Sequence, residues 1–419
     1  MTSLKEKYYQ WLNDPYNGEI LFFTGFTISI FWSVLRTTMF PYSMIAFVVC
    51  LAIAVSLMAA KIILFDTYTF KMLIVVVIMF VCGIMILLSA RYFWPILWLF
   101  VVVASKDIPF RKILQVYLLM NITVMGLAFV ASLLGVIENL AYTSSETERL
   151  RYSFGCAYTT DFAAHVFYMI LTAFYLYHEQ LKWYHYAGTC VIDGFIFYFC
   201  HAKLDTTCII LIVIFFGGYK IKQTLSKKEQ VYITDIATGR NISKVKFFKK
   251  TRAYYRYKKR WKNFAVVSLP LLGLLMYFLS ASYRADNETM AAINEFITGR
   301  LSLAYSGLRK YGISLFGQNV PMEGFGGSLK HTKPYFFIDS SYLFILLRYG
   351  LLFLCMVFII YGIICYKNKH DTALMLVIVI LAISSSIDHH LLEEAYNPFG
   401  YALFASSVAW KKLKVKSEK

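Results

Sequence analysis

Long, nearly continuous runs of apolar residues dominate the chain, and short polar segments separate them. A bilayer core about 30 Å thick is crossed by roughly 20 helical residues. The stronger apolar runs are 20–35, 42–65, 70–89, 113–136, 162–177, 184–200, 264–281 and 342–365. The weaker runs are 92–104, 207–219, 372–387 and 395–410. This pattern predicts an all-α, polytopic integral membrane protein with about twelve transmembrane helices.

The continuity of these runs excludes a transmembrane β-barrel, whose strands alternate apolar and polar residues. Of the 419 residues, 59% are hydrophobic, and the mean hydropathy is +0.58. Such a composition excludes an ordinary water-soluble globular protein. Residues 1–17 are polar, and no small-residue cleavage pattern follows the first apolar run. We therefore expect this run to be retained as a helix.

The distribution of charge predicts the side of the membrane on which each loop lies. The net charge is +18, and cytoplasmic loops carry an excess of Lys and Arg. Residues 220–262 hold 15 Lys and Arg against two acids, and the tail after Trp410 is also basic. Both segments should be cytoplasmic, which leaves residues 282–340 as a large extracytoplasmic loop. The whole chain, 1–419, is predicted to be a single membrane domain.

Two further features limit the partners and cofactors. The basic loop mixes aromatic residues with cations, as segments at a membrane interface do, so we expect it to contact lipid headgroups and no nucleic acid. The eight cysteines form no CxxC pair and no His/Cys metal spacing. We therefore expect them to be small buried side chains, and we expect no metal and no cofactor.

Candidate chemistry gathers in three segments that the charge pattern places outside: 137–161, 282–340 and 388–398. Long loops without a fold of their own are often functional, and ionisable residues near membrane depth are functional candidates. Simpler interpretations exist for some residues: Asp161 is well placed to cap a helix, and Lys203 is well placed to snorkel toward the headgroups.

The order of these residues resembles that of the Wzy-type polysaccharide repeat-unit polymerases, which are relatives of the O-antigen ligases. Four local patterns carry the resemblance: Arg151…Gly155…Thr159-Thr160-Asp161, Thr298-Gly299-Arg300 before Phe316-Gly317, Asp339-Ser340-Ser341-Tyr342 before Arg348-Tyr349-Gly350, and Glu394…Asn397. The chain departs from the family at Thr159-Thr160, where Pro-Asn is usual, and near Lys203, where a Ser-Arg-Thr motif is usual.

The resemblance implies a glycosyltransferase of the bacterial inner membrane that joins oligosaccharide units carried on undecaprenyl pyrophosphate. A pyrophosphate leaving group needs fixed cations, and arginine binds phosphate in bidentate fashion. Arg151 and Arg300 are expected to hold it, which would remove the need for a metal. The supporting cations are expected to be Lys203, Arg284 and Arg348.

The resemblance also implies a base for the acceptor hydroxyl. Glu394 is the best placed candidate, with His389 or His390 next to it. The remaining supporting residues are expected to be Asp161, His165, Asp339, Tyr342 and Asn397. Besides membrane lipids and the lipid-linked oligosaccharide, the expected partners are a flippase and a chain-length regulator.

Three other functions stay open from the sequence, and one of them is a scaffold or lipid-binding protein that catalyses no reaction. An O-antigen-ligase-like transferase would use the same leaving group with a different acceptor, so the sequence separates it poorly from a polymerase. A flippase for lipid-linked oligosaccharide would need broken helices and ionisable residues near the membrane midplane. The concentration of unusual residues in the outer loops favours chemistry at the membrane surface.

Overall fold

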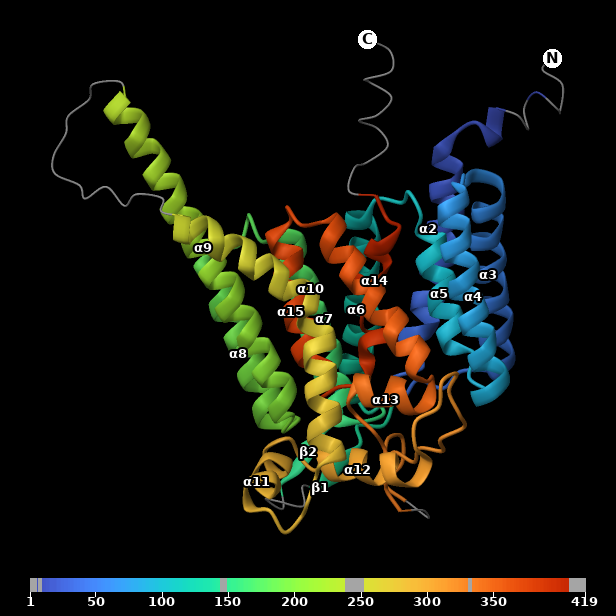
Figure 1. Cartoon of the computed structure of the whole chain (residues 1–419). Helices are drawn as coiled ribbons and strands as arrows, with labels where there is room; N and C mark the ends of the chain where they lie inside the picture. The colour runs from blue at the N-terminus through green and yellow to red at the C-terminus, as the bar shows by residue number, and fades with distance from the viewer. Residues whose placement is uncertain (1–5, 7–9, 144–148, 238–251, 331–333, 407–419) are drawn as a thin grey trace.

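The computed structural model describes residue 6 and residues 10–143, 149–237, 252–330 and 334–406, without the side chains of 226–262 (Figure 1). Almost all of its regular structure is helical. The helices are α2 (Pro15–Leu35), α3 (Met44–Phe65), α4 (Phe70–Ala90), α5 (Trp94–Ala104), α6 (Phe110–Leu133), α7 (Thr159–Tyr177), α8 (Trp183–Phe199), α9 (Lys203–Ala237), α10 (Arg252–Ala281), α11 (Glu288–Phe296), α12 (Arg300–Tyr311), α13 (Ser341–Arg348), α14 (Leu351–Lys367) and α15 (Thr372–Ser384). Two 3-10 helices, η1 (His390–Leu392) and η2 (Phe399–Leu403), follow α15.

Among the described residues, six helices are long and apolar enough to cross a membrane. They are α2, α3, α4, α6 and the parts of α9 and α10 that cover Lys203–Leu225 and Asn263–Ala281. In α4, only 17% of the most apolar window is buried inside the protein. A helix that is apolar on nearly every side and mostly uncovered by protein needs lipid around it. The prediction of an all-α, membrane-embedded protein is confirmed, whereas the total of about twelve spans stays a prediction.

The two ends of the helix bundle differ in character. At one end, α11, α12 and the antiparallel hairpin of β1 (Ala141–Thr143) and β2 (Leu150–Tyr152) gather beneath the other helices (Figure 1). At the other end, α9 and α10 extend away from the bundle. With 35 residues, α9 is about 52 Å long, well beyond the thickness of a bilayer core. We call the hairpin end the outer end and the opposite end the inner end, following the charge distribution.

The predicted span 342–365 is wrong as a single helix, because it divides into α13 and α14 at Gly350. This glycine has φ +90°, a conformation that residues with a Cβ rarely adopt. A Cβ there would lie 2.3 Å from the Gly317 backbone nitrogen and 2.5 Å from the Leu315 carbonyl oxygen. The outer loop therefore packs directly against the backbone at the break, and α13 is a short helix separated from α14 by two non-helical residues.

The predicted last span, 395–410, is not an α-helix in its described part. Residues 395–406 form irregular backbone with the five-residue η2, while 407–410 lie outside the described residues. The segment nevertheless reaches the inner end, because the Ser406 amide donates to the Ile108 carbonyl and the Phe110 amide donates to the Ser406 carbonyl. A Cβ at Gly400 would lie 2.6 Å from the Trp98 ring. Irregular backbone at membrane depth is tolerated when protein surrounds it in this way.

Candidate functional site

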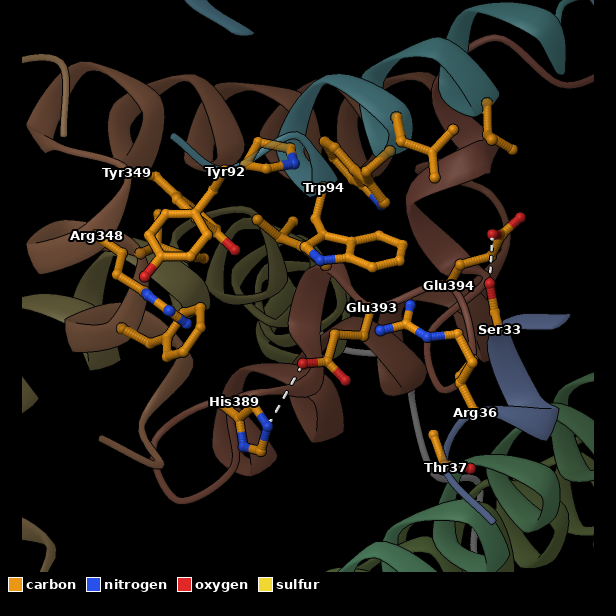
Figure 2. A pocket seen from close by; sticks show the side chains of 18 of the residues that line it. Ser33, Arg36, Thr37, Tyr92, Trp94, Arg348, Tyr349, His389, Glu393 and Glu394 are labelled. Atoms are coloured by element: carbon orange, nitrogen blue, oxygen red, sulfur yellow. Dashed lines mark hydrogen bonds and ion pairs between the residues drawn. The ribbon is translucent and has the colours of Figure 1, made fainter. Parts of the chain in front are cut away.

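A cavity of about 330 Å³ lies at the outer end, where four segments meet (Figure 2). These segments are the end of α2, the start of α5, α13, and the loop that follows α15. Beyond α2 the chain is fixed by the opposite loop, since the Ala157 amide donates to the Thr37 carbonyl and the Met39 amide donates to the Gly155 carbonyl. The volume is at the lower end of the range for small-molecule sites.

Two arginines line this cavity, and each is packed against aromatic rings (Figure 2). The Cζ atom of Arg36 lies 4.5 Å from the ring centre of Trp94 and 4.8 Å from that of Phe47. The Cζ atom of Arg348 lies 3.9 Å from the ring centre of Tyr92. In both arginines Nε is buried and has no hydrogen-bond partner among the described residues. Stacking occupies the faces of a guanidinium and leaves its in-plane N–H groups for an anion.

Glu394 lies on the same cavity, at the side formed by α2. Its Oε2 accepts hydrogen bonds from the Ser29 hydroxyl at 2.7 Å and from the Ser33 hydroxyl at 2.9 Å. Its Oε1 is buried without a partner. Burial raises the pKa of Glu394 to about 7, although the two serine hydroxyls oppose this shift by stabilising the charged form. The carboxyl can therefore exchange a proton near neutral pH.

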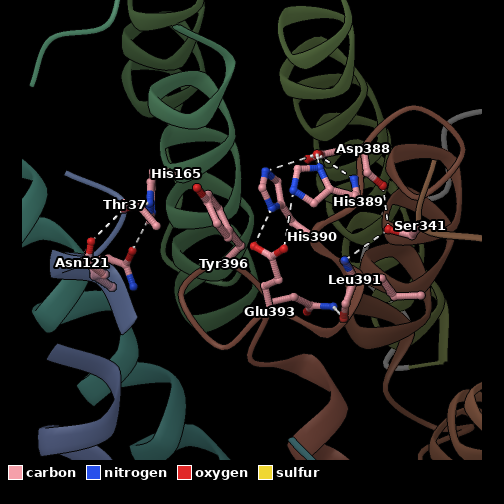
Figure 3. A network of polar contacts seen from close by, with 12 residues as sticks. Thr37, Asn121, His165, Ser341, Asp388, His389, His390, Leu391, Glu393 and Tyr396 are labelled. Atoms are coloured by element: carbon pink, nitrogen blue, oxygen red, sulfur yellow. Dashed lines mark hydrogen bonds and ion pairs between the residues drawn. The ribbon is translucent and has the colours of Figure 1, made fainter. Parts of the chain in front are cut away.

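Beside the cavity, Asp388, His389, His390 and Glu393 form a compact polar cluster (Figure 3). Burial lowers the pKa of both histidines to about 3, so both imidazoles are neutral at pH 7. Burial raises the pKa of Glu393, while His389 and the cavity arginines oppose that rise. One ligand atom from each of Asp388, His389 and His390 lies within 4.8 Å of the others, so these three residues have the donors to hold a metal ion.

A second polar network connects the bundle interior to this cluster (Figure 3). His165 is fully buried in α7, with Nε2 at 2.7 Å from the Thr37 hydroxyl and Nδ1 at 3.0 Å from the Asn121 amide oxygen. Its ring stacks on Tyr396 at a centroid distance of 4.1 Å, and Tyr396 stacks on His390 at 3.6 Å. His165 thus contacts the cavity wall through Thr37 and supports the cluster through Tyr396.

The two arginines expected to hold the pyrophosphate do not line the cavity. Arg151 donates from Nη2 to the Thr159 hydroxyl at 2.7 Å and from Nε to the Cys200 carbonyl at 3.1 Å. Arg300 donates from Nε to the Ile387 carbonyl at 2.6 Å. In this conformation, both side chains use donors to hold loops at the outer end.

The other expected site residues fall into three groups. Arg348, His389 and Glu394 line the cavity, and His390 lies directly behind it. Tyr342 and Asn397 are buried and stabilise the fold by hydrogen bonds to the backbone. The Tyr342 hydroxyl donates to the Ala382 carbonyl at 2.7 Å, and the Asn397 amide donates to the Leu391 carbonyl at 2.8 Å. The remaining residues lie away from the cavity lining.

Those remaining residues occupy separate places at the outer end. Asp339 pairs with Arg300 at 3.6 Å, and burial raises its pKa while Arg300 opposes the rise. Asp161 lies in the first turn of α7, Lys203 begins α9, and Arg284 is exposed after α10. The structure therefore brings three of the expected residues onto the cavity and leaves the others around it.

Sequence reasoning missed Arg36, Tyr92 and Trp94, all of which line the cavity. A signal for Arg36 was present, because a cation at the outer end of an apolar run opposes the positive-inside tendency. Tyr92 and Trp94 gave no such signal, since aromatic residues at the end of a span are typical of the membrane interface.

No model of a known protein family matches the chain, and comparisons with curated proteins and with solved structures likewise find no match. Its function is therefore inferred from the geometry and chemistry of the cavity.

Proposed function

We propose that the chain is a glycosyltransferase of the bacterial plasma membrane that joins oligosaccharide units carried on undecaprenyl pyrophosphate. The observation that carries this proposal is the cavity with two stacked arginines, whose Nε groups are buried without partners, and a buried carboxyl at the same cavity. A buried donor without a partner is costly, so a bound anion would satisfy it. Among the candidate glycosyl-transfer reactions, polymerisation of repeat units is the one that the resemblance to the Wzy-type family supports best.

The arginines would act on the leaving group. When the bond between the sugar C1 and the phosphate oxygen breaks, negative charge develops on the pyrophosphate. Arg36 and Arg348 are held by aromatic faces, so little reorganisation is needed for them to donate to those oxygens.

Glu394 would act on the acceptor. The hydroxyl of the incoming unit forms the new bond to C1, and its proton passes to the carboxylate. A pKa of about 7 lets Glu394 be ionised in a large fraction of molecules at neutral pH and still hold a proton well. His389 lies on the same cavity, but burial holds its pKa near 3, which makes it a weaker base.

The ligase-like alternative shares this leaving-group chemistry and is distinguished only by its acceptor. A flippase is favoured less, because it would need ionisable residues near the membrane midplane, whereas the ionisable residues of the cavity belong to the ends of α2 and α13 and to the loop after α15.

The proposal is tested by deleting the gene and complementing it with variants, followed by gel analysis of surface polysaccharide. Arg36→Ala and Arg348→Ala should each yield single repeat units without a ladder, and lysine at either position should restore little, since lysine lacks the planar fork. Arg309→Ala is the matched control, because Arg309 also stacks on a tyrosine, Tyr305, at 5.7 Å but does not line the cavity.

The outcomes separate the candidate functions. Long polymer that stays on the lipid carrier would indicate a ligase, and the absence of lipid-linked glycan at the outer face would indicate a flippase. Normal ladders from both cavity variants, at normal protein levels, would rule out the anion site. Purified protein in proteoliposomes with lipid-linked repeat units then tests polymerisation directly.

A further inference from the structure

The cluster beside the cavity places two imidazole rings between two carboxyl groups. His390 faces Asp388 with Nε2 at 3.2 Å and Glu393 with Nδ1 at 2.8 Å. His389 faces the same two carboxyl groups, with Nδ1 at 3.7 Å from Asp388 and Nε2 at 3.4 Å from Glu393. Each ring therefore presents one nitrogen to Asp388 and the other to Glu393.

The shortest approach joins His390 Nδ1 to Glu393 Oε2 at 2.8 Å. Glu393 also faces His389 Nε2 at 3.4 Å. The opposite nitrogens, His389 Nδ1 and His390 Nε2, both face Asp388 Oδ1, which also accepts a hydrogen bond from the His389 backbone amide at 2.8 Å. One ligand atom from each of these three residues lies within 4.8 Å of the others, so the donors converge as the ligands of a metal ion do.

We propose that Asp388, His389 and His390 bind a divalent transition-metal ion, with Zn²⁺ the best match. Two imidazole nitrogens and one carboxylate oxygen form a donor set that suits Zn²⁺. Ligand atoms of a tetrahedral Zn²⁺ site lie about 3.3 Å apart, given bonds of about 2.0 Å. The approaches of 3.2 and 3.7 Å to Asp388 Oδ1 match that spacing after a small movement of His389.

Three features support a built site. The second carboxylate oxygen of Asp388, Oδ2, is buried and has no hydrogen-bond partner among the described residues. The backbone of Asp388 is fixed, because its carbonyl accepts from both the Ser341 amide and the Ser341 hydroxyl at the start of α13. Glu393 behind the rings matches the carboxylate that orients ligating histidines in many zinc sites.

The position of this site gives it a consequence for the cavity. His389 and Glu393 line the cavity, whereas Asp388 and His390 lie behind its wall. Three protein ligands leave a coordination position for water. The metal would lie on the Asp388 side of the rings, behind the cavity wall, and would fix the loop that carries Glu393 and Glu394. The binding claim itself does not depend on glycosyl transfer.

The test uses the full-length protein purified in detergent, stripped with EDTA and titrated with Zn²⁺ and with Co²⁺. Exposed Cys190 and Cys355 are first replaced by Ser to remove adventitious thiolate ligands. We expect about one Zn²⁺ per chain by elemental analysis, and a Co²⁺ absorption spectrum typical of tetrahedral nitrogen and oxygen ligands. Asp388→Asn and His390→Ala should lose this binding.

Two variants keep the test interpretable. Glu393→Gln removes an orienting carboxylate without removing a ligand, so Zn²⁺ affinity should fall about 10- to 100-fold. His370→Ala alters an exposed histidine before α15 and should leave binding unchanged. Absence of stoichiometric Zn²⁺ in the wild type would overturn the proposal. Equal affinity in the wild type and in folded Asp388→Asn would overturn it as well.

Discussion

Replacing Glu394 by Gln should stabilise the protein while abolishing its activity. The substitution keeps the shape of the side chain and the acceptor for Ser29 and Ser33, but it removes the negative charge. Raising the pKa from 4.5 to about 7 corresponds to roughly 3 kcal/mol, because each factor of ten in proton affinity is worth about 1.4 kcal/mol. That free energy is the cost of ionising Glu394 in its buried position.

The dependence on pH has a definite direction. Below about pH 4.5 the carboxyl is protonated in both the folded and the unfolded state, so its charge costs nothing. As the pH rises toward 7, the unfolded state releases its proton first, and the free energy of unfolding falls by up to roughly 3 kcal/mol. Above the folded pKa the penalty stays constant. The advantage of Glu394→Gln over the wild type should therefore grow from near zero at about pH 4.5 to its full value at about pH 8.

Thermal unfolding of both proteins in the same detergent, followed by circular dichroism across this pH range, measures the effect. For a chain of 419 residues, roughly 3 kcal/mol corresponds to a rise in Tm of about 3 °C at high pH. Glu295→Gln, at an exposed position on α11, is the matched control and should show no such trend. A difference in Tm that is independent of pH, or a wild type that is the more stable at about pH 8, would refute the buried-charge argument.

Three further changes test the fold. Gly350→Ala should lower stability by at least about 2 kcal/mol, measured as a lower unfolding temperature, because φ is +90° and a Cβ would meet backbone atoms. Lys61→Met should lower the free energy of unfolding by about 3–5 kcal/mol in the same assay, because Asp66 stays buried without the ammonium group that lies 2.6 Å from it. Adding Asp66→Leu to this variant should recover much of the lost stability. The third change tests the orientation of the chain in the membrane, in a background without the exposed native cysteines. Ser328→Cys should react with an impermeant thiol reagent added outside intact cells, and Lys369→Cys should not. The reverse result would mean that the orientation is inverted.

The helices were predictable because apolar runs of spanning length have few other structures available to them in lipid. The last run, 395–410, shows the limit of that argument. Hydropathy reports that a segment is surrounded by apolar atoms, but it does not report whether those atoms belong to lipid or to protein. Here Trp98 and the neighbouring helices surround the segment, so its described backbone does not need to be helical.

The site was predictable only in part, for a related reason. Glu394, His389 and Arg348 stand out as ionisable residues within or beside apolar segments. Arg36 is held on the cavity wall by Trp94, which belongs to a different helix. The packing of α3 against both α2 and α5 brings these two residues together. The sequence contains both residues but no information about that contact. Arg151 and Arg300 match motifs, yet their donors bind backbone carbonyls in the folded chain.

The early end of α15 explains how so many ionisable groups are placed beside an apolar bundle. This helix has 13 residues and is about 20 Å long, so it ends about 10 Å short of crossing a bilayer core. The chain then returns as irregular backbone, whose polar groups must be satisfied by protein. Ser341 binds the Asp388 carbonyl, Asn397 binds the Leu391 carbonyl, and Arg300 binds the Ile387 carbonyl. Ser341 and two of the expected site residues, Asn397 and Arg300, therefore hold the loop on which the cluster and Glu394 lie, and substituting them should disturb the cavity through its backbone.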